Sequence, residues 1–150
     1  MMIEAAKVMG AFPAGGWGVG IAPDASWMAR AAHPWMHTGV IHAVVNCYVL
    51  LQLTFFCDVS LRKLAVAYLI ACLCPASVAM MGGQGRVVGM SGVVYALMGM
   101  MLTKMPRRLR LCGWIAAYLL MGYAVGGVAV VFHLYCLVIG WGISRVSRNG

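Results

Sequence analysis

The chain has 150 residues, of which 63% are hydrophobic and 9% are charged, and its mean hydropathy is +0.90. This length allows one domain at most, and this apolar balance excludes a soluble enzyme and indicates a membrane protein with several spans. The net charge of +8 comes from basic residues clustered between apolar runs, which is typical of loops facing anionic lipid and argues against a nucleic-acid binder.

The N-terminal segment, residues 1–36, is predicted to be a loop or an interfacial stretch, with a degenerate first span as the alternative. Residues 1–22 are apolar on average, but they carry Glu4, Lys7 and several glycines, which weaken a spanning helix. Indole side chains concentrate at the level of the lipid headgroups. The segment has three of them, at Trp17, Trp27 and Trp35.

Residues 37–146 are predicted to form the helical core of a single all-α membrane domain that extends over residues 1–150. This core has five apolar runs. They are about Thr38–Phe56, Leu64–Met81, Val88–Thr103 and two more that share Leu111–Ser144, with a turn near Gly126 and Gly127. About 17 residues per run are enough to cross a hydrocarbon core of ~30 Å when the helix is little tilted.

Basic residues in the loops predict the orientation of the chain. If every run crosses once, the loops after the first, third and fifth runs lie on one side of the membrane. They hold Arg62, Lys63, Lys104, Arg107, Arg108, Arg110, Arg145 and Arg148, whereas the other side holds only Lys7, Arg30 and Arg86. The positive side is the cytoplasmic one, so the C-terminus is predicted to be cytoplasmic.

Five polar side chains within or beside the apolar runs are candidates for a functional site, because such groups are expensive in hydrocarbon. His42 and Asn46 are four residues apart and share one helix face, and so do Ser91 and Tyr95. With His133 in the last run, the residues His42, Asn46 and Ser91 are predicted to lie in the outer half of the membrane. A hydroxyl, an imidazole and an amide at one depth are the components of an acyl-transfer site.

Each of these residues also has a structural interpretation. A serine in a span usually bonds to a carbonyl of its own helix, a histidine can join two helices or bind a metal, and an asparagine can hold two helices together. Their shared depth favours a joint role instead. Gly89 and Gly92 support it, because they leave the Ser91 hydroxyl unshielded and allow a close approach of another helix.

Three stretches resemble the rhomboid family of intramembrane serine proteases. Gly89-Met-Ser-Gly-Val-Val-Tyr-Ala-Leu-Met-Gly99 is similar to the nucleophile motif of that family, and His33-Pro-Trp-Met-His-Thr-Gly-Val-Ile-His-Ala-Val-Val-Asn46 is similar to its histidine and asparagine stretch. His133, with Gly140 seven residues later, resembles the histidine of its last span. The resemblance covers roughly residues 27–145 in the family's order.

The resemblance implies a role for each of these residues. Ser91 would be the nucleophile and His133 its general base. His42, Asn46 and the Ser91 backbone N–H would form the oxyanion hole, Tyr95 would pack on His133, and His37 would be a structural outer-loop residue. Because Glu4, Asp24 and Asp58 lie outside the runs, we expect a Ser–His dyad in which an aromatic ring, and no carboxylate, orients the imidazole.

The resemblance also implies what the protein acts on. The expected substrates are transmembrane segments of other proteins, unwound near the outer surface so that a scissile carbonyl is exposed, with small residues beside the cut. The expected location is the bacterial inner membrane, in contact with the lipid bilayer. No cofactor and no metal are expected, and the sequence leaves the oligomeric state open.

Two alternatives remain at this stage. Phe132 and Cys136 stand where the family commonly has a small residue and a glycine, and their bulk would move the last helix away from the Ser91 helix. In that case the protein would bind transmembrane segments without cutting them. The 13 Met, six Cys and four His would also suit a carrier of Cu(I), although no paired motif places them on one face.

Overall fold

The computed structural model describes residues 19–57, 59–81, 85–102, 108–125 and 129–149. In chain order its helices are α2 (Trp27–Ala32), the 3-10 helix η1 (His33–Trp35), α3 (Val40–Phe56), α4 (Leu61–Cys72), α5 (Ala76–Ala79), α6 (Ser91–Met101), α7 (Arg108–Val125) and α8 (Val130–Asn149). Within the described ranges, one isolated antiparallel bridge between Ile21 and Val87 is the only extended pairing. The predicted all-α class is therefore confirmed for this part of the chain.

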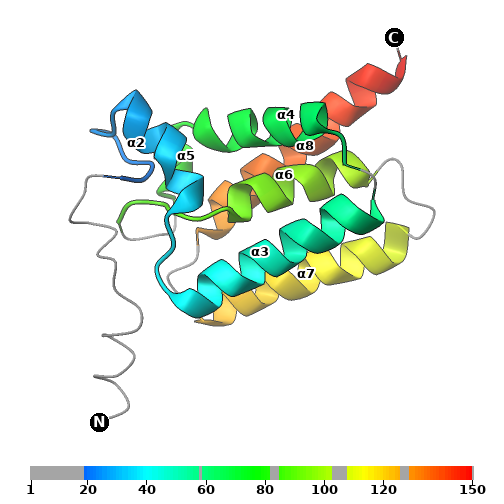
Figure 1. Ribbon diagram of the computed structural model, residues 1–150, viewed down its shortest axis with the longest axis horizontal. Coiled ribbons are helices and arrows are strands. Elements are labelled where there is room, and N and C mark those ends of the chain that lie inside the picture. Colours follow the sequence, from blue (N-terminus) through cyan, green and yellow to red (C-terminus); the bar gives the residue numbers. More distant parts are fainter. Residues whose placement is uncertain (1–18, 58, 82–84, 103–107, 126–128, 150) are drawn as a thin grey trace.

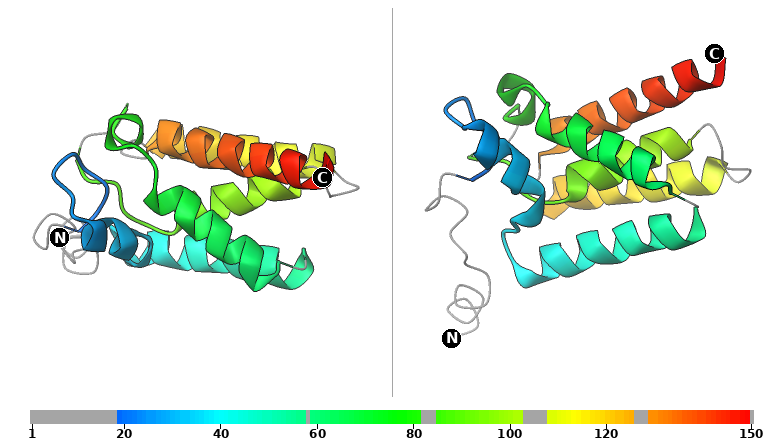
Figure 2. Two further views of the ribbon diagram at one scale, coloured as in Figure 1. Left: turned by 90° about the horizontal axis from the view of Figure 1, so that it is seen from above. Right: turned by 45° about the horizontal axis from the view of Figure 1, so that its top comes forward.

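Helix α6 lies at the centre of the bundle (Figures 1 and 2). It packs most extensively against α8, next against α4 and more weakly against α3, while α7 lies on the outside against α8. All 11 residues of α6 are buried. A helix that is covered on every side needs an apolar sequence all round, which explains why Ser91–Met101 contains no charged residue.

The chain reverses direction from each long helix to the next, from α3 through α4, α6 and α7 to α8 (Figure 1). The first residues of α3, α6 and α8 therefore gather at one end of the bundle, on the left in Figure 1, where α2 and α5 also lie. We call this the loop end. Arg30 lies in α2 and Arg86 pairs with Asp24, just before α2, so both belong to the loop end. Arg62 is the second residue of α4, which begins at the opposite end (Figure 1).

The predicted runs match the helices with three corrections. The run Leu64–Met81 is divided into α4 and α5, because Pro75 lacks the N–H that a continuing helix needs. Helix α6 begins at Ser91 and not at Val88, since Val87 pairs with Ile21 in an extended conformation. Arg108 and Arg110 belong to helix α7, not to the loop before it. The predicted turn at residues 126–127 lies outside the described residues.

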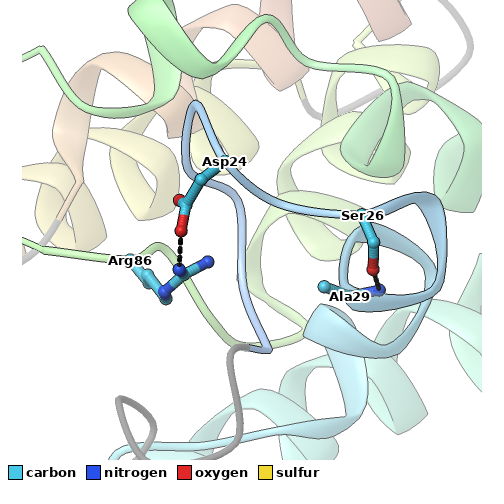
Figure 3. Close-up of polar contacts among 4 residues, drawn as sticks. All are labelled: Asp24, Ser26, Ala29 and Arg86. Carbon is cyan, nitrogen blue, oxygen red and sulfur yellow. Dashed lines mark hydrogen bonds and ion pairs between the residues drawn. The ribbon is translucent and has the colours of Figure 1, made fainter.

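The N-terminal segment is more helical than the sequence predicted. Residues 27–35 form α2 and η1, and Ser26 caps α2 by accepting a hydrogen bond from the Ala29 N–H at 3.2 Å (Figure 3). Ser, Thr, Asp and Asn are the side chains that satisfy the first N–H groups of a helix. The alternative of a degenerate span concerns residues 1–22, of which residues 1–18 lie outside the described residues.

Among the described residues, no single helix is both long enough and apolar enough to cross a membrane. Trp27–Trp35 and Val40–Phe55 meet the requirement only as a pair, bent by 83° at the break between them. The other apolar helices are shorter, namely Ser91–Met101, Leu111–Leu120 and Val130–Val146.

Candidate active site

The loop that leads into α6 is attached to residues 21–24, which precede α2. Ile21 and Val87 exchange two backbone hydrogen bonds, of 2.9 and 3.2 Å. Beside this bridge, Arg86 forms an ion pair with Asp24 (Figure 3). The Asp24 side chain is 70% exposed, so the ion pair contributes little to stability, and the backbone pairing is the firmer attachment.

Gly89 turns the loop toward α6. Its φ of +114° is a conformation that residues with a Cβ rarely adopt. The Gly89 N–H donates to the carbonyl of His33 at 2.9 Å, and the chain then enters α6 at Ser91. The two attachments at Val87 and Gly89 fix the backbone immediately before the candidate nucleophile.

Ser91 and His133 lie in direct contact. The distance between Ser91 Oγ and His133 Nε2 is 2.8 Å, and both side chains are buried, with exposed fractions of 8% and 7%. Ser91 is the first residue of α6 and His133 lies in the first turn of α8. When Nε2 carries no proton, the hydroxyl donates to it, which is the arrangement that nucleophilic attack by a serine requires.

The His133 ring is oriented by aromatic neighbours. Tyr95, one turn after Ser91 on α6, stacks on it with ring centroids 4.5 Å apart and an interplanar angle of 15°. The Phe132 ring also lies near it, with centroids 5.8 Å apart and an interplanar angle of 49°. Asp24 is the only acidic residue in the described part of the chain, and it pairs with Arg86 in the loop before α6. Within the described residues, the stacked ring of Tyr95 and no carboxylate contacts the imidazole.

His42 and Asn46 of α3 face the Gly89 turn. A Cβ added at Gly89 would stand 2.8 Å from His42 Cε1 and 3.1 Å from His42 Nε2, so the glycine leaves room for the His42 ring, while Asn46 Nδ2 lies at an ordinary contact distance of 3.7 Å. Asn46 is 7% exposed, and its Nδ2 has no hydrogen-bond partner among the described residues. A buried donor without a partner costs free energy, and it is positioned to bind an oxygen that enters the site.

The tautomer of His42 depends on Thr38. Thr38 Oγ1 lies 3.1 Å from His42 Nδ1. When this hydroxyl donates to Nδ1, the neutral imidazole carries its proton on Nε2, the nitrogen that faces Gly89. The sequence reasoning overlooked Thr38, although its position four residues before His42 is a recognisable signal.

His37 supports the same loop from the segment between η1 and α3. Its Nε2 accepts the Met90 N–H at 3.5 Å, and its ring meets the His42 ring edge to face, with centroids 5.2 Å apart. Burial lowers the pKa of His37, and a hydrogen bond with the backbone of Trp35 partly opposes that shift. A neutral His37 keeps the lone pair with which it accepts from Met90.

The bulk of Phe132 and Cys136 does not separate the helices, contrary to the expectation from sequence. The Phe132 ring occupies the space beside Gly92, where a Cβ would stand 2.4 Å from Phe132 Cζ. Phe132 and Cys136 are fully buried, and the 2.8 Å contact between Ser91 and His133 is kept. The missing side chain of Gly92 thus compensates for the large one of Phe132.

All the candidate site residues are brought together at the loop end. Among the described residues, no group of three or more His, Cys, Asp or Glu side chains could hold a metal ion. The Cu(I) carrier therefore gains no support from this part of the chain. The site contains a hydroxyl in contact with an imidazole. Beside them lie the Asn46 amide, which has no partner among the described residues, and backbone N–H groups.

Comparison with known proteins gives one match. The family model described as the Rhomboid domain matches residues 24–148, which is most of the chain. Neither the curated proteins nor the solved structures gave a match. The matched range contains every residue placed in the site above.

Proposed function

Because the chain belongs to the rhomboid family, whose members are generally intramembrane serine proteases, we propose that it is a serine endopeptidase that cuts transmembrane segments of other proteins. Membership makes it an integral membrane protein. The observation that most supports catalysis is the 2.8 Å contact between Ser91 Oγ and His133 Nε2. A nucleophile within hydrogen-bond reach of its base is the requirement for activation.

In the proposed reaction, Ser91 Oγ attacks the scissile carbonyl carbon while His133 Nε2 accepts the hydroxyl proton. The C–N bond of the tetrahedral intermediate then breaks as His133 passes this proton to the leaving amine, and an acyl-enzyme ester remains. Water attacks the ester, again losing a proton to His133, and release of the carboxylic acid restores Ser91. His133 serves as base and acid in turn, so no further proton donor is needed.

The negative oxygen of each tetrahedral intermediate would be bound at the Gly89 turn. Asn46 Nδ2, His42 Nε2 and the Ser91 backbone N–H are its donors, and the N–H groups at the start of a helix have no partner within that helix. Preorganised donors of this kind each contribute on the order of 10²–10³ in rate. Asn46 Nδ2, buried without a partner among the described residues, would gain one in the substrate oxygen.

The proposed substrates are transmembrane segments that unwind near the outer surface. Unwinding exposes a carbonyl that a helix would otherwise keep in its own hydrogen bonds. The proposed spans are α3, α4, α6, α7 and α8, with the loop end outward and the C-terminus in the cytoplasm of a bacterial cell, at its inner membrane. The basic residues Arg62 and Arg145, at the end opposite the site, support this orientation.

Labelling with a fluorophosphonate probe, together with cleavage of a labelled transmembrane substrate in vesicles, tests the proposal. Ser91→Ala and His133→Ala are expected to abolish both signals, since each removes one half of the dyad. Ser77→Ala, which changes an exposed serine on α5, is the matched control and should retain both. Equal processing by the wild type and by Ser91→Ala would leave a rhomboid protein that binds transmembrane segments without cutting them.

Substrate choice can be tested with two matched segments. A segment broken by Gly and Pro is expected to be cleaved, whereas a stable poly-leucine segment of equal length is not, because its carbonyls stay within the helix. Equal cleavage of the two would refute the requirement for unwinding.

A further inference from the structure

Tyr68 of α4 forms hydrogen bonds with two residues of the segment that consists of α2 and η1. Its hydroxyl donates to the backbone carbonyl of Ala31, and it accepts the indole N–H of Trp35 at 3.3 Å. Ala31 is the last but one residue of α2, and Trp35 is the last residue of η1. One hydroxyl thus ties both ends of a short stretch, residues 31–35, to the helix bundle.

His33 lies in the middle of that stretch. It is fully buried, its Nδ1 contacts the Arg30 carbonyl at 2.6 Å, and its ring meets Phe132 edge to face at 6.0 Å. Its own carbonyl accepts the Gly89 N–H at 2.9 Å. The position of the His33 carbonyl therefore sets the position of the Gly89 turn, against which His42 and Asn46 lie.

A second link from α4 reaches the same segment. Arg30 Nη1 donates to the carbonyl of Cys74 at 2.9 Å, just beyond the end of α4. Carbonyl groups at the end of a helix lack partners within the helix, and a cation is favourable there. Arg30 thus anchors the segment at one end, and the Tyr68 hydroxyl bonds to residues on both sides of His33.

From these contacts we infer that Tyr68 is a positioning residue for the oxyanion hole, an inference that rests on the proposed protease function. Its hydroxyl bonds to Ala31 and Trp35, and not to the dyad or the Gly89 turn. Its hydroxyl acts through residues 31–35 and the His33 carbonyl, which hold Gly89 where the substrate oxygen would bind. Small displacements of catalytic groups lower kcat more than they lower substrate binding.

Tyr68→Phe tests this inference, because it keeps the ring and removes only the hydroxyl. Two readouts are needed, the hydrogen exchange of the Gly89 amide and the separate values of kcat and KM. We expect Gly89 to exchange roughly three- to tenfold faster, as for the loss of one hydrogen bond. We expect kcat to fall roughly 10- to 100-fold, with KM nearly unchanged.

Two further variants complete the design. Tyr48→Phe changes an exposed tyrosine on α3 and should match the wild type in both readouts. Trp35→Phe removes the indole N–H that Tyr68 accepts, so it should have a smaller effect of the same kind. The double variant should then behave like Tyr68→Phe alone, because both changes remove one shared contact.

The inference is overturned if Gly89 exchange in Tyr68→Phe equals that of the wild type, or if exchange rises equally throughout α4 and α6, which would indicate general destabilisation. Additive effects of Tyr68→Phe and Trp35→Phe would also contradict it. The exchange readout does not depend on proteolysis. If the wild type shows no Ser91-dependent cleavage, the proposed function fails, while the Gly89 exchange still decides whether Tyr68 positions the loop.

Discussion

Gly140 of α8 lies directly against the backbone of Ala96 in α6. A Cβ built at Gly140 would stand 2.2 Å from the Ala96 carbonyl oxygen, and one built at Gly99 would stand 2.1 Å from the carbonyl oxygen of Leu137. The two helices therefore touch backbone to backbone at two reciprocal points, as small residues allow in membrane bundles. This contact sets how close His133 comes to Ser91.

Gly140→Ala is expected to impair both stability and activity. The atom in the way belongs to a backbone carbonyl, so the helices must move apart, at a cost of about 1–3 kcal/mol. Displacement of His133 from Ser91 should lower kcat by roughly 10²-fold. Gly142→Ala is the matched control on the same helix, because no heavy atom of the described chain lies within 4 Å of its added Cβ. Equal behaviour of the two variants in thermal unfolding and cleavage assays would contradict this account.

Phe132 and Gly92 should show a strong coupling in a double-mutant cycle. Gly92→Ala alone places a methyl group 2.4 Å from Phe132 Cζ and should destabilise the protein. Phe132→Ala alone removes a fully buried ring, at a cost of about 3–5 kcal/mol. In the Phe132→Ala background, the nearest remaining neighbour of the Gly92→Ala methyl is the Ala71 Cβ, at 3.1 Å, so the methyl should cost much less than it does beside Phe132. Thermal unfolding of all four proteins measures the coupling, and additive effects would disprove the compensation.

The sequence predicted the parts of the site that depend on local spacing. His42 with Asn46, and Ser91 with Tyr95, were placed on common helix faces, and these four residues do gather with His133. Spacing along one helix is fixed by its period, so this part of the arrangement needs no knowledge of the tertiary structure. The roles of these residues in catalysis stay predictions.

The sequence did not predict the contacts that join distant segments. The bridge between Ile21 and Val87 involves ordinary apolar residues, and the contact of Tyr68 with Ala31 uses a backbone carbonyl that no side chain marks. The bulk of Phe132, considered alone, suggests that α8 is pushed away from α6, whereas its ring fits beside Gly92. Such contacts follow from packing among several helices, which a pattern within one helix does not encode.

Gly89→Ala is expected to remove most of the activity. Alanine is strained at a φ of +114°, and its Cβ would lie 2.8 Å from His42 Cε1, so His42 must leave its position. Loss of one oxyanion donor lowers kcat by about 10²–10³. Gly85→Ala is the matched control, since it has a similar φ of +102° but no described heavy atom within 4 Å of the added Cβ. A similar loss of kcat in both variants would show that backbone strain, and not the displacement of His42, causes the effect.

Tyr95 is expected to act through its ring and not through its hydroxyl. Because the ring stacks on His133 at 4.5 Å, Tyr95→Phe should keep kcat within about threefold of the wild type, as such a pair contributes about 0.5–1.5 kcal/mol. Tyr95→Leu removes the stacking surface and should lower kcat by roughly tenfold or more. Steady-state cleavage by the two variants measures the difference. A larger loss in Tyr95→Phe than in Tyr95→Leu would show that the hydroxyl is the important group.

The pH dependence of stability should report the protonation of His37. Burial lowers its pKa from the ordinary value of 6.5, so the unfolded chain binds a proton at this position more readily than the folded protein does. This difference in pKa stabilises the folded protein fully above about pH 6.5. The stabilisation is lost as the pH falls from there toward the lower pKa of the folded state. His37→Gln keeps an acceptor for the Met90 N–H but does not titrate. Its melting temperature should therefore decline less than that of the wild type below pH 6.5, and identical profiles for the two proteins would show that His37 does not contribute.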